Sequence, residues 1–132
     1  MRLAWLLAAL LAASGVQAKC LLPAQKPMVE AELLFGRDIP GGGTVSDEAW
    51  ADFATTAITQ EFPDGFTVSD AEGTWRDAAN GAAVHERSKI VLIDGRATPV
   101  FARKLKRVAE LYRARFRQDA VGIVTREVCA AF

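Results

Sequence analysis

The residues of this chain that could perform chemistry are few, and their spacing matches no common catalytic or metal-binding motif. His85 is the only histidine among 132 residues, so a histidine cluster for a metal ion is excluded. Ser88 has no histidine on its own face of the predicted hairpin, which leaves a hydrolase triad without its base. The glycines at 41–43 are not followed by a lysine and show no GxGxxG spacing, so we expect a flexible structural loop there. The sequence predicts no catalytic residue, no metal site and no cofactor.

One group of residues has the mixed character of a ligand-binding surface. It combines an aromatic side chain with basic and acidic ones between the glycine loop and a predicted hairpin, and it consists of Arg37, Trp75, Arg76, Glu86 and Lys89. An indole ring offers a platform for stacking, and the charged groups would orient a polar ligand. The alternative interpretation is cross-strand salt pairing around a packed tryptophan.

The balance of charge argues against one class of partner. The chain has 16 basic and 16 acidic side chains, and its formal net charge is zero. Proteins bind nucleic acids and anionic membranes through an excess of lysine and arginine. We therefore expect no nucleic-acid partner.

The first eighteen residues have the composition of a signal peptide. Met1 and Arg2 form a short positive start, the stretch 3–13 is almost wholly apolar, and small residues at 16–18 suit cleavage. The apolar run is too short to span a bilayer, which takes about 20 residues, so no stable membrane span remains after cleavage. We expect a periplasmic or secreted protein with one domain over residues 19–132. Acylation of Cys20 is a less favoured alternative, because Lys19 occupies the place where lipoprotein signals have a small residue.

The two cysteines, Cys20 and Cys129, lie near the two ends of the predicted mature chain. Disulfides persist in the oxidising compartments to which exported proteins go, so we expect these residues to be bonded to each other. Two free thiols are the alternative.

Turn residues and hydrophobic periodicity divide the chain into six elements. Helix starts are marked by the capping residues Ser46 and Thr98, with Pro99 at the first helical position. Alternating or β-branched patterns predict strands, and apolar residues at helical spacing predict helices. The expected elements are a strand at 28–35, a helix at 47–61, strands at 66–76 and 84–93, a helix at 99–118 and a strand at 121–128.

This order predicts an α+β domain with the ferredoxin-like split βαββαβ arrangement, a four-stranded antiparallel sheet with two helices on one face. Right-handed crossovers place the first strand between the third and the last. The end of the last strand then lies beside the start of the first. Cys20 and Cys129 occupy those two places, so the topology agrees with the expected disulfide.

The face of the sheet away from the helices is expected to carry any binding function. If Asn80-Gly81 is a two-residue hairpin loop, Arg76 pairs with His85 and Trp75 with Glu86. This register places charged residues near the hairpin tip on the uncovered face. It makes the base of that face apolar through Val68, Val91 and Ile93. A second subunit in a homodimer or a long loop would then cover them.

Several segments resemble a bacterial family catalogued as a domain of unknown function, number 3574. The resemblance covers nearly the whole mature domain and is carried by Leu34-Phe35-Gly36, Pro40-Gly41-Gly42-Gly43-Thr44-Val45-Ser46, Phe62-Pro63-Asp64-Gly65-Phe66-Thr67-Val68, Gly73-Thr74-Trp75-Arg76 and Glu86-Arg87-Ser88-Lys89. Members often have Gly-Gln-Trp where this chain has Gly-Thr-Trp. The resemblance implies a small exported single-domain protein and implies no activity.

Two functions remain as expectations. The sparse chemistry favours a non-catalytic module that binds a small ligand or an envelope protein through the open face of the sheet. The alternative is a cofactor-independent enzyme with its pocket at a dimeric interface. In that enzyme Glu86 or His85 would be the base, and Arg76 or Arg37 would stabilise an anion.

Overall fold

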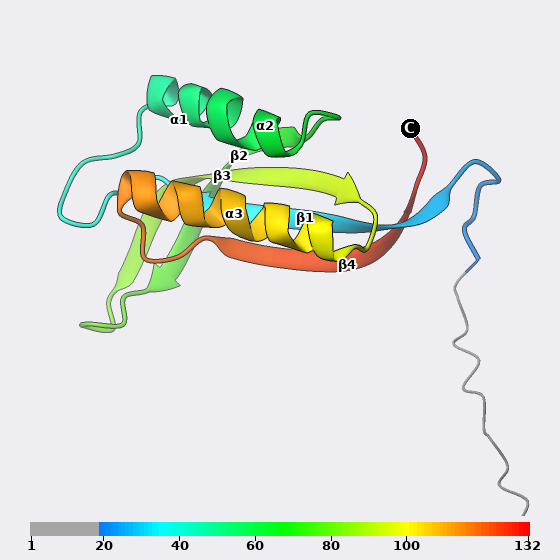
Figure 1. The fold of residues 1–132 in the computed structure, drawn as a ribbon. Coiled ribbons are helices and arrows are strands. Elements are labelled where there is room, and N and C mark those ends of the chain that lie inside the picture. Colours follow the sequence, from blue (N-terminus) through cyan, green and yellow to red (C-terminus); the bar gives the residue numbers. More distant parts are fainter. Residues whose placement is uncertain (1–18) are drawn as a thin grey trace, which may run out of the picture.

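Four strands and two helical segments follow one another in the order βαββαβ in the computed structural model, which describes residues 19–132 (Figure 1). The predicted signal peptide at 1–18 lies outside the described residues. The elements are β1 (Lys26–Gly36), α1 (Asp47–Phe53), the π-helical turn η1 (Ala54–Ile58), α2 (Thr59–Glu61), β2 (Thr67–Arg76), β3 (Ala83–Gly95), α3 (Pro99–Phe116) and β4 (Gly122–Ala130). The first three helical pieces form one continuous run over 47–61. In the part of the chain described, no helix is both long and apolar enough to cross a membrane.

The predicted caps fix the starts of both helical segments. Oγ of Ser46 accepts a hydrogen bond from the Ala49 N–H at 3.1 Å, and Oγ1 of Thr98 accepts one from the Phe101 N–H at 3.1 Å. The second helix ends two residues earlier than predicted, because Arg117 adopts a left-handed conformation with φ 52°.

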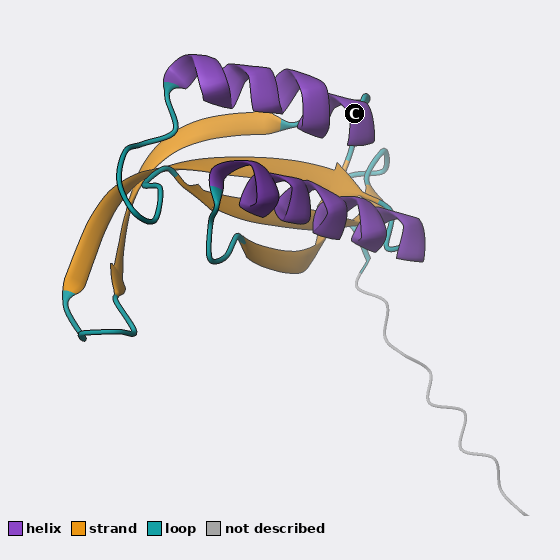
Figure 2. Ribbon diagram, turned by 60° about the vertical axis from the view of Figure 1, so that its left-hand side comes forward, coloured by secondary structure: helices purple, strands orange, loops and turns teal. Residues whose placement is uncertain are grey.

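The sheet has the predicted topology, with strand order β2-β3-β1-β4 and antiparallel neighbours throughout. Both helical segments lie on one side of it (Figures 1 and 2). Alternate residues of β1 form the floor of the core, where Phe35 contacts Trp50 of α1 and Tyr112 of α3 with ring centroids 5.2 Å and 4.8 Å apart. This α+β, ferredoxin-like arrangement confirms the predicted fold class.

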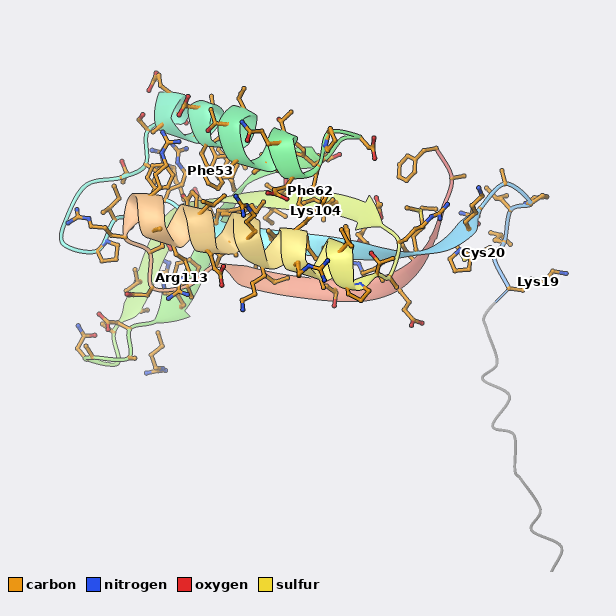
Figure 3. All side chains as sticks on the ribbon, in the orientation of Figure 1. Lys19, Cys20, Phe53, Phe62, Lys104 and Arg113 are labelled. Carbon is orange, nitrogen blue, oxygen red and sulfur yellow. A yellow bond between two sulfur atoms is a disulfide. The ribbon has the colours of Figure 1, made fainter. Side chains whose placement is uncertain are left out.

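Phe53 and Lys104 connect the two helical segments to each other (Figure 3). Phe53 of α1 packs against Tyr112 of α3 with ring centroids 5.0 Å apart. Nζ of Lys104 donates to the carbonyl of Glu61 at 2.7 Å and lies over the Phe62 ring. The two helical segments are therefore tied together at both ends.

The disulfide between Cys20 and Cys129 is present, with the two Cα atoms 5.6 Å apart. Cys129 lies opposite Pro27 in the ladder between β4 and β1, so the arm before β1 brings Cys20 to the end of β4. The Gln25 side chain also donates to the Cys129 carbonyl at 3.2 Å. The predicted pairing is confirmed.

The predicted hairpin register is wrong by two residues. Arg76 pairs with Ala83 and Trp75 with Val84, because the loop spans 77–82 instead of two residues. Hydrogen bonds inside the loop stabilise this length. The Asp77 N–H donates to the Ala82 carbonyl, and the Asn80 side chain accepts from the Ala82 N–H.

The predicted face for the apolar hairpin residues is also wrong. Val91 and Ile93 are buried against the helices, and Val68 lies on the same side of the sheet. The opposite face, which we call the open face, carries every second residue of β3. Ile90 and Leu92 are half-buried there. The helices therefore cover Val91 and Ile93, whereas Val68 on the edge strand stays 37% exposed.

Candidate functional site

The five residues proposed from the sequence lie on two sides of the sheet. Alternation along β3 and β2 places Glu86 and Trp75 on the open face, and Lys89 on the side of the helices. Arg37 follows β1 on the helix side. Arg76 donates to the Gly81 carbonyl at 2.9 Å within the hairpin loop. The structure therefore divides the five between the two faces of the sheet, and they do not form one cluster.

Glu86 is a buried carboxylate on the open face. Only 9% of the residue is exposed, and Oε2 accepts a hydrogen bond from the Asp38 N–H at 2.8 Å. Gly36 leaves the room for it, because a Cβ at that position would lie 2.9 Å from the Glu86 carboxyl carbon. No ion pair with Glu86 occurs among residues 19–132.

Burial raises the pKa of Glu86, because an ionised carboxylate loses hydration in a low-dielectric site. The hydrogen bond from Asp38 opposes this rise in pKa, and the nearby Asp38 carboxylate adds to it. A cationic group would lower the pKa, and no described residue supplies one to Glu86.

The ring of Trp75 lies over Gly73, which is the residue opposite Glu86 on the neighbouring strand. A Cβ on Gly73 would lie 2.6 Å from Cζ3 of Trp75 and 3.3 Å from Oγ of Ser88. Gly73 is the ladder partner of Glu86, so the indole lies over the strand next to Glu86 on the same face of the sheet, and the carboxylate lies over Gly36 on the other neighbouring strand. Trp75 is 45% exposed, and Oγ of Ser88 is buried without a hydrogen-bond partner.

This arrangement, which we call the open-face cluster, consists of Gly36, Gly73, Trp75, Glu86 and Ser88. It combines a carboxylate lacking a counter-ion with an aromatic ring, which are the two groups that bind organic cations in proteins. Among the described residues, no group of three His, Cys, Asp or Glu side chains could hold a metal ion.

Gly36, Gly73 and Ser88, the small members of this cluster, were not predicted from the sequence. Glycine inside a strand often marks a place where another group approaches closely, so Gly36 and Gly73 carried a usable signal. Ser88 could be found only from the correct register, which places it opposite Ala71 and Gly36.

The other two proposed residues line a groove of about 510 Å³ on the helix side of the sheet. Arg37 is 3% exposed, donates to the Val45 carbonyl and pairs with Asp47 at 2.8 Å. Lys89 pairs with Asp70 at 2.5 Å. The hydrogen bond and charge of Lys89 hold the pKa of Asp70 below its usual range, with smaller contributions from nearby arginines.

His85 does not take part in either group. It is exposed, and its Nδ1 lies 2.8 Å from Oγ1 of Thr74, its actual ladder partner. The pairing of His85 with Arg76 expected from the sequence is absent.

Comparison with known proteins identifies a family and a fold. A family model described as "Protein of unknown function (DUF3574)" matches residues 30–132. No curated protein matches the chain at a significant level.

Three solved structures illustrate the similarity in fold. A phage SAM lyase in complex with S-methyl-5'-thioadenosine has a TM-score of 0.63 and 16% identity over 88% of this chain and 96% of that chain. A phage SAM lyase in the apo state has a TM-score of 0.61 and 17% identity over 88% and 97%. CutA1 from Oryza sativa has a TM-score of 0.55 and 11% identity over 83% and 86%. At these identities the similarity is one of fold alone.

Proposed function

The chain belongs to this family of proteins of unknown function (DUF3574), and we propose that it is a non-catalytic module that binds a small organic cation. The site is the open-face cluster, with the carboxylate of Glu86 and the indole of Trp75 as the binding groups.

The observation that carries the proposal is the missing counter-ion of Glu86. A carboxylate in a buried residue costs free energy unless it is paired, and the hydrogen bond from Asp38 compensates only in part. A ligand cation would supply the partner that the described residues do not supply. The negative charge of Glu86, whose burial costs free energy in the unliganded protein, would then favour binding of the cation.

The position of Trp75 supports a cation with an apolar body. The ring is half-exposed although it lies against Gly73, so a face or edge of it stays available to a ligand. Cation–π attraction contributes about 0.5 to 2 kcal/mol, depending on how far the cation is desolvated. A carboxylate and an indole together select organic cations over small, strongly hydrated metal ions.

We place this module outside the cytosol, in the periplasm or in the secreted fraction. The Cys20–Cys129 disulfide supports this, because such bonds persist mainly in oxidising compartments. The leader composition of residues 1–18 agrees with it.

A second candidate is a cofactor-independent enzyme in which Glu86 is a general base. The raised pKa of Glu86 favours this alternative, because bases with a pKa nearer to neutrality transfer protons efficiently. Such an enzyme would need a second copy of the chain to enclose the open face, and a homodimer would provide one. A SAM lyase shares the fold, although no substrate follows from that similarity.

The test is isothermal titration with matched pairs of probes. Choline and its neutral carbon isostere 3,3-dimethylbutan-1-ol differ in charge at nearly constant shape. S-adenosylmethionine and S-adenosylhomocysteine, which lacks only the sulfonium methyl group and its positive charge, form a second, larger pair. We expect the cations to bind and their neutral analogues to bind at least about tenfold more weakly, since one charged interaction is worth about 1.5 to 3 kcal/mol.

Variants locate the site. Glu86→Gln is expected to weaken cation binding about tenfold, and Trp75→Ala about threefold to tenfold. Glu110→Gln, which removes an exposed carboxylate from α3, is the matched control and should leave binding unchanged. Equal affinity of the wild type and Glu86→Gln for every cation would refute the proposal. Turnover of S-adenosylmethionine that is lost in Glu86→Gln would favour the enzyme.

A further inference from the structure

The groove on the helix side is a second site, separate from the open-face cluster. Six charged side chains line it, three basic and three acidic, and we call it the charged groove: Arg37, Asp47, Asp70, Glu72, Arg87 and Lys89. Its volume of about 510 Å³ falls in the range of small-molecule pockets. The two sites lie on opposite faces of the sheet, so binding in the charged groove is independent of the proposed cation site.

The ladder register separates the charges within the groove. The Arg37 N–H donates to the Arg87 carbonyl at 3.0 Å, and Arg87 pairs with Glu72, so these three form one row across the strands. Lys89 and Asp70 form the next row. The basic residues therefore lie on or beside the central strands, and two acidic residues lie on the edge strand β2. Neighbouring strands are about 4.8 Å apart, so opposite charges stand within one small ligand's length.

Two of these groups are opposite one another and remain unpaired. Glu72 and Arg87 are ladder partners of opposite charge, yet no ion pair between them occurs among the described residues. Both are exposed. Arg37 uses Nε and Nη2 for Val45 and Asp47, and its Nη1 makes no hydrogen bond to a described residue and is not among the buried unpartnered atoms, so it is accessible from the groove.

The sum of charges in the groove favours a dipolar ligand. A simple anion would be attracted by three basic groups and repelled by three carboxylates, and a simple cation would meet the reverse. A ligand with both charges can turn each end toward its complement. We infer that the charged groove binds a small zwitterion of the α-amino-acid type, with its carboxylate toward Arg37 and Arg87 and its ammonium group toward Glu72.

Amide NMR titration of the protein with L-alanine and the other L-amino acids tests this. Propionate and ethylamine are single-charge analogues of alanine that lack its ammonium group and its carboxylate, respectively. At least one amino acid is expected to shift the amide signals of residues 70–72 and 87–89. For alanine, each analogue is expected to bind about tenfold more weakly, because each loses one charge-assisted contact.

Substitutions of the unpaired groups complete the test. Arg87→Met and Glu72→Gln are exposed changes that leave the groove's other ion pairs intact, and each should weaken binding about tenfold. Lys106→Met and Glu110→Gln on α3 are the matched controls, with no change expected. Absence of any response to all amino acids would overturn the inference. Propionate binding as tightly as alanine would overturn it too, because the groove would then be a plain anion site.

Discussion

Replacement of Gly36 by alanine is expected to destabilise the protein through Glu86. The added Cβ would lie 2.9 Å from the carboxyl carbon of Glu86 and nearer still to Oε1. The carboxylate must therefore move away from the Asp38 N–H, from which Oε2 accepts a hydrogen bond at 2.8 Å. Gly36 does not have a positive φ, so alanine suits the backbone itself.

The size of the effect follows from two opposing contributions. Loss of a hydrogen bond to a charged group costs about 1.5 to 3 kcal/mol. Alanine in a strand regains about 0.5 to 1 kcal/mol relative to glycine. The net loss in the free energy of unfolding is about 1 to 2 kcal/mol, which corresponds to a fall in Tm of about 4 to 8 °C for a domain of this size.

A double-mutant cycle isolates the cause. Urea unfolding would be measured for the wild type, Gly36→Ala, Glu86→Ala and the double variant. Because Glu86→Ala removes the group that the methyl collides with, Gly36→Ala should be neutral or slightly stabilising in that background. An equal loss of stability in both backgrounds, or no loss in the wild type, would refute the placement of Glu86 over Gly36.

Three further measurements test the fold and the site. Replacement of both Cys20 and Cys129 by serine should lower stability by up to about 4 to 5 kcal/mol, because the bond closes a loop with a sequence separation of 109; unchanged thermal unfolding would contradict this. Tyr112→Phe should cost about 1 to 3 kcal/mol in urea unfolding, since the buried hydroxyl donates to the Gly36 carbonyl at 2.8 Å, and a neutral result would exclude that bond. Glu86→Gln should gain stability relative to the wild type as pH rises. The pKa of Glu86 is raised in the folded protein, so folding disfavours the ionised form of this residue. The pH-dependent gain of Glu86→Gln over the wild type should be absent below the pKa of the unfolded chain and complete above the pKa of the folded protein. Parallel stability curves of the two proteins from about pH 4 to pH 8 would argue against this explanation.

The topology was predictable because local signals agreed with one another. Ser46 and Thr98 cap helices where the sequence placed them, and the order of elements left one reasonable arrangement of four strands. The cysteine positions were consistent with that arrangement and are bonded. A chain specifies a single fold when its local signals, such as helix caps and hydrophobic patterns, agree with its long-range contacts, such as a disulfide.

The hairpin register was not predictable from the dipeptide alone. Asn80-Gly81 suits a two-residue loop, and Gly81 does have a positive φ of 72°. The side chains of Asp77 and Asn80 nevertheless accept backbone hydrogen bonds that stabilise a longer loop. Their contribution decides the register, and sequence patterns do not report it.

The identity of the covered face was also beyond the sequence. Alternation separates the two faces of β3 and does not say which one the helices contact. Lys89 and Arg87 share a face with Val91 because they are two and four residues away from it on the same strand, and there the face becomes a groove lined by charged side chains. The proposed site residues were consequently assigned to one surface although they belong to two.

The cation site is tested most directly by the titration of Glu86 by carboxyl ¹³C NMR, with and without choline. We predict that the pKa of Glu86 in the free protein lies above its ordinary range and falls when choline binds, because the cation stabilises the ionised form. An ordinary pKa that choline does not change would contradict the account of the open-face cluster as a cation site.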